Sequence, residues 1–193
     1  KMTSLKLIFK KLQDRFGKQR WWPGDTKYEI IVGAILTQNV SWNNVEKALT
    51  NLKEKEVLSP EEIIRLSNEE LESLIKPTGF YKKKAKRLKR ISKVILEEKY
   101  VHRFLSDKKL RNKLLETKGI GPETADSIIL YAAERPTFVI DAYTKRIFKR
   151  VEGIEGGYNG LQSFFERELP TNLKIYQEYH ALLVKLGKKY CRS

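Results

Sequence analysis

The stretch KGIGPETAD, residues 118–126, combines residue types that could bind a phosphate group. Gly119 and Gly121 lack a Cβ, so both can adopt a positive φ and allow close approach of another backbone. Pro122 suits the first position of a helix, where a missing N–H costs nothing. The turn would expose N–H donors at a helix N-terminus, and the helix dipole there also favours a phosphate oxygen. An ordinary turn between two helices, stopped by glycine, is the alternative interpretation.

Two helices must position this turn. Leu110, Leu114 and Leu115 end the first helix, and apolar residues at 125, 128, 129 and 132 give the second a buried face. Ile120 can insert inward and lock the two helices together. Such a hairpin would contact phosphates and read no bases, so it would position DNA without choosing a sequence.

The charge balance favours a polyanionic partner. The 193 residues include 39 Lys and Arg against 24 Asp and Glu, a net charge of +15. A lysine-rich, solvated surface is the alternative. No apolar run approaches the roughly 18 residues that suggest a membrane span, and the start lacks a signal-peptide core. We therefore expect a cytoplasmic, nucleoid-associated protein with no membrane partner. The single cysteine, Cys191, excludes an internal disulfide framework.

Helical periodicity dominates the chain and predicts an all-α fold of about ten short helices. Asp25 is the expected N-cap of a buried, apolar helix that starts near Lys27, and Ser59 is the expected N-cap before Pro60. A glycine-rich loop is expected at 153–160. The other expected helices cover 5–16, 45–55, 67–75, 82–99, 105–117, 123–134, 142–151, 161–168 and 172–187.

The stretch KGIGPETADSIILYAAERPTFVIDAYTKRIFKRV resembles the helix-hairpin-helix, Gly/Pro-rich loop and aspartate signature of the endonuclease III superfamily of DNA glycosylases. The segments QNVSWNNVEKA (38–48) and YHALLVKLGKKYC (179–191) extend the resemblance over most of the chain. It implies two helical lobes flanking a DNA-binding groove, and a monomer that binds double-stranded DNA with a damaged base. The expected lobes are 1–24 with about 136–193, and about 25–135 with the hairpin at about 110–134.

By this resemblance Asp141 is the catalytic aspartate. Cleavage of an N-glycosidic bond builds positive charge on the deoxyribose, and a carboxylate aimed there stabilises that charge and can orient water. A purely structural role is also open, because Asp141 precedes a helix and is a good N-cap. Both roles can hold together.

The lysine used by family members that also cut the DNA backbone is replaced here. That lysine stands two residues after the last hairpin glycine and forms a Schiff base with the sugar. This position is Glu123, which cannot form an imine, so the sequence resembles the monofunctional branch. Glu123 itself can favour a helix N-terminus. A relocated lysine such as Lys118 stays an alternative.

Aromatic residues surround the expected DNA-insertion loop: Trp21, Trp22, Tyr28 and Trp42. An aromatic pocket suits a cationic base such as an N-alkylated purine. The chain also resembles endonuclease III-type 3-methyladenine glycosylases, which implies a base pocket of Trp22, Pro23 and Trp42. For the tryptophan pair at 21–22, attachment of the N-terminal helix to the core is the alternative role.

Gln38 or Asn39 would fill the gap that the extruded base leaves. The basic residues of 82–90 could contact phosphates, although a solvated face explains them equally well: Lys82, Lys83, Lys84, Lys86, Arg87, Lys89 and Arg90.

Many relatives hold an iron–sulfur cluster with four cysteines near the C-terminus. Cys191 stands where the first ligand would be, and one thiolate cannot hold a cluster. We therefore expect no metal in the chain as given, and a 4Fe–4S cluster only if the native chain continues past Cys191 with three more cysteines.

Three functional interpretations follow. The first is a monofunctional glycosylase for alkylated purines, the second a bifunctional glycosylase/lyase for oxidised bases, and the third a non-catalytic helix-hairpin-helix DNA-binding module.

Overall fold

The computed structural model describes residues 4–191, and every regular element in that range is a helix. The predicted all-α class is therefore confirmed. The chain divides into two compact units, Gly24–Ala133 and Lys1–Pro23 with Glu134–Ser193, which we call the central unit and the terminal unit. No helix among the described residues combines the length and the apolar character that crossing a bilayer requires.

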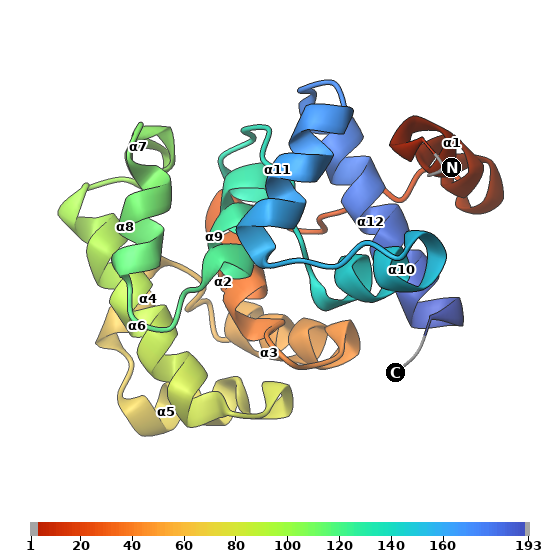
Figure 1. Ribbon diagram of the computed structural model, residues 1–193. Coiled ribbons are helices and arrows are strands. Elements are labelled where there is room, and N and C mark those ends of the chain that lie inside the picture. Colours follow the sequence, from red (N-terminus) through yellow and green to blue (C-terminus); the bar gives the residue numbers. More distant parts are fainter. Residues whose placement is uncertain (1–3, 192–193) are drawn as a thin grey trace. The chain divides into compact units, whose positions relative to one another are not determined.

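The central unit is built around α2, whose residues Ile31, Val32, Ile35 and Leu36 have no solvent exposure. It packs against α6 and the helices that follow the hairpin (Figure 1). The elements of this unit are α2 (Lys27–Leu36), α3 (Trp42–Glu54), α4 (Pro60–Arg65), α5 (Asn68–Leu74), η1 (Lys76–Thr78), α6 (Tyr81–Glu97), α7 (Val101–Ser106), α8 (Leu110–Glu116), α9 (Pro122–Ser127) and the π-helical turn η2 (Ile128–Ala132).

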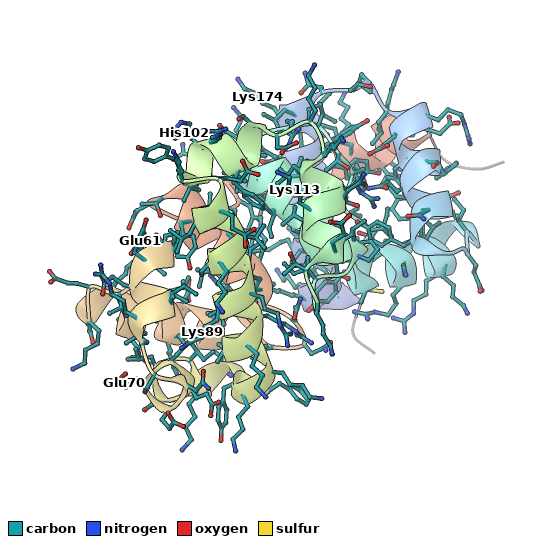
Figure 2. The ribbon with its side chains drawn as sticks, turned by 90° about the vertical axis from the view of Figure 1, so that its left-hand side faces the viewer. Glu61, Glu70, Lys89, His102, Lys113 and Lys174 are labelled. Atoms are coloured by element: carbon teal, nitrogen blue, oxygen red, sulfur yellow. The ribbon has the colours of Figure 1, made fainter. Side chains whose placement is uncertain are left out.

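Local capping explains where several of these helices begin. The Ser59 side chain accepts a hydrogen bond from Glu62 N, as predicted. Ser67 and Glu70, the latter labelled in Figure 2, form a reciprocal capping box at the start of α5. The Asp25 prediction is wrong, because Thr26 is the N-cap of α2 and accepts from Glu29 N.

Three other boundaries differ from the predictions. The helix expected at 105–117 is two helices, α7 and α8, separated at Asp107, whose carboxylate accepts from Lys109 N and so competes with the helix. The helix expected at 123–134 changes from α to π at Ile128. The glycine-rich loop is shorter than expected, since the next helix already begins at Tyr158.

The terminal unit comprises α1 (Leu5–Phe16), α10 (Ala142–Glu152), α11 (Tyr158–Glu168) and α12 (Leu173–Tyr190), with α12 packing against both α10 and α1 (Figure 1). Aromatic rings fill its core: Phe138 stacks on Phe165 at 4.4 Å between centroids and meets Tyr179 edge-on at 5.8 Å. The extended segment before α10 is fixed by a hydrogen bond from Phe138 N to Glu166 Oε1 of 2.8 Å.

The helices α10 and α12 cross closely at Gly187. A Cβ at Gly187 would lie 2.2 Å from the Tyr143 ring, so only glycine leaves room for that ring. This crossing fixes the start of α10, and therefore Asp141, against α12.

Candidate functional site

The hairpin joins α8 to α9, and its two glycines have different roles. Gly119 has a φ of +99°, and a Cβ there would lie 2.5 Å from Arg87 Nε. Gly121 has a φ of −96°, so the expectation of a positive φ is wrong for this residue. A Cβ on Gly121 would meet nothing within 4 Å, which leaves the space beside its backbone open. Ile120 lies between them and is 5% exposed, its N–H bonded to Thr117 O.

A partly buried ion pair braces the two helices of the hairpin. Arg111 on α8 donates from Nε to Asp126 Oδ1 at 2.7 Å and from Nη2 to Asp126 Oδ2 at 3.1 Å. Asp126 on α9 is completely buried. A two-point contact of this kind restricts both distance and angle, so it holds the hairpin rigid. This pair was not predicted from the sequence.

Gln38 is attached to the same hairpin. Its Nε2 donates to Thr124 Oγ1 at 2.8 Å and lies 3.5 Å from Gly119 O, while its Oε1 accepts from Arg87. Its neighbour Asn39 is exposed and has a φ of +54°, at the apex of the turn after α2. Of the two residues predicted for DNA insertion, Gln38 is thus held by side-chain hydrogen bonds to the hairpin and to Arg87, whereas Asn39 is exposed.

Several cations of α6 support the fold. Lys84 is 1% exposed and donates to Leu36 O at 2.8 Å and to Thr78 O at 2.7 Å. Lys89, labelled in Figure 2, donates to Leu66 O, and Arg90 donates to Lys118 O. These three residues therefore serve the fold, a role that neither phosphate contact nor a solvated face describes. The members that stay exposed without such a contact are Lys82, Lys83 and Lys86.

Asp141 lies at the start of α10 and has two neighbours in the terminal unit. Its Oδ1 accepts from Thr144 N at 2.7 Å, so the N-cap role is real. Its Oδ2 lies 3.4 Å from His180 Nε2 on α12. The Asp141 side chain keeps 11% of its area exposed, so it is not sealed off completely from solvent.

The Asp141 carboxylate stays ionised although it is buried. Burial is the largest single effect and would raise the pKa of Asp141. Hydrogen bonding and charge at His180, together with hydrogen bonds from Thr144, outweigh burial and hold the pKa below its ordinary value. The side chain therefore carries a negative charge at neutral pH.

The aromatic residues occupy different parts of the chain. Trp22 and Pro23 belong to the terminal unit, where the ring centroids of Trp21 and Trp22 lie 5.2 Å apart. Trp42 starts α3 in the central unit and donates from Nε1 to Glu46 Oε1 at 2.8 Å. Tyr28 is 4% exposed and bonds to Ser92 in the core, so it is a structural residue.

Comparison with known proteins places the chain in a family. Residues 32–170 match the HhH-GPD superfamily of base excision DNA repair proteins. The chain belongs to this superfamily. The predicted resemblance to the endonuclease III superfamily is confirmed by this match together with the endonuclease III relatives.

Individual relatives agree with this assignment. The chain is 48% identical to a candidate DNA repair glycosylase of Methanocaldococcus jannaschii, over 96% of this chain and 88% of that protein. It is 26% identical to endonuclease III of Thermotoga maritima, over 86% of this chain and 75% of that protein. The structure of an H. pylori 3-methyladenine DNA glycosylase bound to 1,N6-ethenoadenine superposes with a TM-score of 0.87 and 31% identity, covering 97% and 98% of the two chains.

Two positions of this HhH-GPD chain concern its chemistry. Glu123, where lyases of the superfamily have lysine, is exposed in the first turn of α9, and Lys118 is exposed in the hairpin. Cys191 Sγ accepts a hydrogen bond from Arg150 Nη1 at 3.2 Å. A four-cysteine cluster does not fit the residues present, since the chain as given has one cysteine and its described part holds no group of metal-binding side chains.

Proposed function

We propose that this HhH-GPD protein is a monofunctional DNA glycosylase that hydrolyses the N-glycosidic bond of N-alkylated purines in double-stranded DNA. The observation that carries this proposal is the Asp141 carboxylate, whose pKa is held below its ordinary value, which is oriented by Thr144 N and whose side chain keeps 11% of its area exposed.

The reaction requires stabilisation of a cationic sugar. As the bond between C1′ and the base nitrogen breaks, its electron pair leaves with the base, and positive charge develops on the deoxyribose. The Asp141 carboxylate stabilises that charge. Water then attacks C1′, its hydroxyl stays on the sugar, and its proton leaves to solvent. A cationic N-alkylated purine departs as the neutral base, so the leaving group needs no added proton.

Glu123 supports hydrolysis by water over lyase chemistry. A carboxylate cannot form the imine through which a lysine cuts the backbone. The product would then be an intact strand with an abasic site. Lys118 lies in the hairpin and is the nearest alternative amine in sequence.

The substrate class rests on the aromatic residues and on one relative. Trp22, Pro23 and Trp42 stand at the pocket positions that the family resemblance implies, and aromatic faces attract a cationic base by roughly 0.5–2 kcal/mol. The 31% identity to the H. pylori 3-methyladenine glycosylase favours the same substrate class.

DNA would be held by Gly119, Ile120 and Gly121 through a phosphate, with Gln38 or Asn39 in the gap of the extruded nucleotide. Of these two, Asn39 can enter the duplex without breaking a contact, whereas Gln38 must first leave Arg87 and Thr124.

The test is release of damaged bases from defined duplexes. Duplexes with 3-methyladenine, hypoxanthine, uracil or 8-oxoguanine are incubated with the protein and resolved on gels with and without alkali. We expect cleavage of the 3-methyladenine strand only after alkali, and no adduct on borohydride treatment. Asp141→Asn should lower the single-turnover rate by about 100- to 1,000-fold while DNA affinity is retained.

Each alternative has its own result. Strand cleavage without alkali and a borohydride-trapped adduct would identify a bifunctional lyase. Salt-sensitive DNA binding with no release of any base, unchanged in Asp141→Asn, would identify a non-catalytic binding module.

A further inference from the structure

A second titratable residue faces Asp141 from a distant part of the chain. His180 Nε2 lies 3.4 Å from Asp141 Oδ2, and the two residues are 5% and 8% exposed. They stand on different helices, and the close crossing of α10 and α12 at Gly187 fixes their separation. Such a buried polar pair is costly unless both partners are satisfied.

We propose that His180 is a positioning residue for Asp141, which orients the carboxylate when the imidazole is neutral and weakens its action when the imidazole is protonated. This inference rests on the proposed catalytic role of Asp141. No family resemblance or aligned motif assigns His180 a part in the reaction.

The neutral imidazole supplies orientation. A proton on Nε2 would face Oδ2 across 3.4 Å, a contact that does not meet hydrogen-bond geometry in this structure, while Thr144 N holds Oδ1. The carboxylate then has Oδ1 fixed by a hydrogen bond and a neutral polar neighbour beside Oδ2, and its negative charge is left for the sugar. A fixed charge stabilises a transition state better than one that must reorient during the reaction.

The protonated imidazole removes much of that advantage. An imidazolium 3.4 Å from Oδ2 forms an ion pair with Asp141, and its positive charge repels the cation that develops on the sugar. The proton stays on His180, and no bond to the substrate forms or breaks. The rate of base release therefore falls as His180 gains a proton.

Three other charged groups, on α1, α10 and α11, have hydrogen bonds to partners other than His180. Asp141, at the start of α10, is the carboxylate that faces His180. On the remaining elements Arg15 of α1 contacts Tyr190, Arg146 of α10 contacts Cys191 O, and Glu166 of α11 accepts from Phe138 N.

The test compares single-turnover rates from pH 5 to pH 9 on a duplex with an N-alkylated purine, corrected for release without enzyme. His180→Gln places an amide donor near the position of Nε2 and cannot be protonated. We expect it to keep the wild-type rate at pH 8 within about fivefold and to lose the fall in rate toward pH 5. His180→Leu should lose about 10- to 100-fold at pH 8, the size of a hydrogen bond to a charged group, with DNA affinity unchanged.

The matched control is His102→Gln. His102 is the other histidine of the chain, is exposed on α7 in the central unit, and stacks on Tyr100. This variant should keep the wild-type fall in rate at low pH.

Several outcomes would overturn the inference. A wild-type rate that is constant between pH 5 and pH 8 would contradict it without any variant. A fall in rate toward pH 5 in His180→Gln that equals the fall in wild type would also contradict it. His180→Asn is a second non-titrating replacement if the glutamine variant does not fold. Failure of the proposed function gives a different result, because the rate of base release in Asp141→Asn would then equal that of wild type, independently of the protonation of His180.

Discussion

Gly119 and Gly121 stand on either side of Ile120, and a methyl group would have different consequences at each. At Gly119 the backbone has a φ of +99°, and the Arg87 side chain occupies the space that a Cβ would need. At Gly121 the backbone is extended and the space is open. If a phosphate group approaches this hairpin, Gly121 is therefore the glycine whose missing Cβ serves the ligand.

We predict that Gly119→Ala and Gly121→Ala separate stability from DNA binding. Gly119→Ala should lower the free energy of unfolding by about 1–3 kcal/mol, because alanine is strained at positive φ and would displace Arg87. Gly121→Ala should change the free energy of unfolding by less than about 0.5 kcal/mol but weaken binding to an undamaged duplex severalfold. Urea denaturation and fluorescence anisotropy measure the two quantities.

Each variant is the control for the other. Full DNA affinity in a stable Gly121→Ala protein would show that the hairpin backbone is not in contact with a phosphate.

At the scale of elements, Lys84 joins three parts of the central unit. It extends from α6, and its ammonium group donates to the last residue of α2 and to the last residue of η1. Those residues precede two turns, one with Asn39 and one with the exposed Phe80. Burial, with repulsion from Arg87, lowers the pKa of Lys84 from its ordinary 10.5 to about 8.

This shift predicts a pH dependence of stability with a definite sign. Between pH 8 and pH 10.5 the unfolded chain keeps a proton on Lys84 that the folded protein has released, so the free energy of unfolding rises with pH in that window. Relative to Lys84→Met, which cannot titrate, wild type should gain about 2 kcal/mol between pH 7.5 and pH 10. Guanidinium denaturation of both proteins at each pH measures the difference.

Lys86→Met is the matched control, since Lys86 is exposed on the same helix. Its free energy of unfolding should run parallel to that of wild type over the same range. Parallel curves for wild type and Lys84→Met would contradict the lowered pKa.

The sequence predicts elements well where the determinants are local. Ser59 and Ser67 cap helices through residues three positions away, and a single stretch of sequence contains both partners. Asp25 and Thr26 are adjacent, and both residue types are good N-caps, so the sequence pattern does not decide which of them caps α2. In the structure the N-cap is Thr26. The break at Asp107 requires a side-chain contact with Lys109 N that competes with helical hydrogen bonds.

The residues of the candidate site also differ in whether local sequence or long-range contacts determine them. Asp141 and the hairpin glycines belong to one continuous motif, so the sequence alone could predict them as site residues. His180 is 39 positions from Asp141 (180 − 141), and a single histidine on an apolar helix face has no local signal. Arg111 and Asp126 likewise become partners only after the hairpin folds, because their contact needs the crossing of α8 and α9.

At the scale of the whole molecule, the net charge of +15 overstates the cations that can bind phosphate. Several of them donate to backbone carbonyl groups instead: Lys27 to Ala132, Lys84 to Leu36 and Thr78, Lys89 to Leu66, Arg90 to Lys118 and Arg146 to Cys191. The salt dependence of DNA binding should therefore follow local contacts beside the hairpin rather than total charge.

Two double variants with equal charge change test this. Lys83 and Lys86 are exposed on α6, whose Arg87 and Arg90 contact the hairpin, whereas Lys6 and Lys10 are exposed on α1. Either pair changed to glutamine lowers the net charge from +15 to +13 (15 − 2). Each neutralised phosphate contributes about 0.9 to the slope of log K against log salt, so the α6 variant should lose about 1.8 and the α1 variant less than about 0.5. Anisotropy titrations from 50 to 200 mM salt, roughly the range over which such contacts dominate, give both slopes. Equal losses would mean that total charge, and not the surface beside the hairpin, sets the affinity.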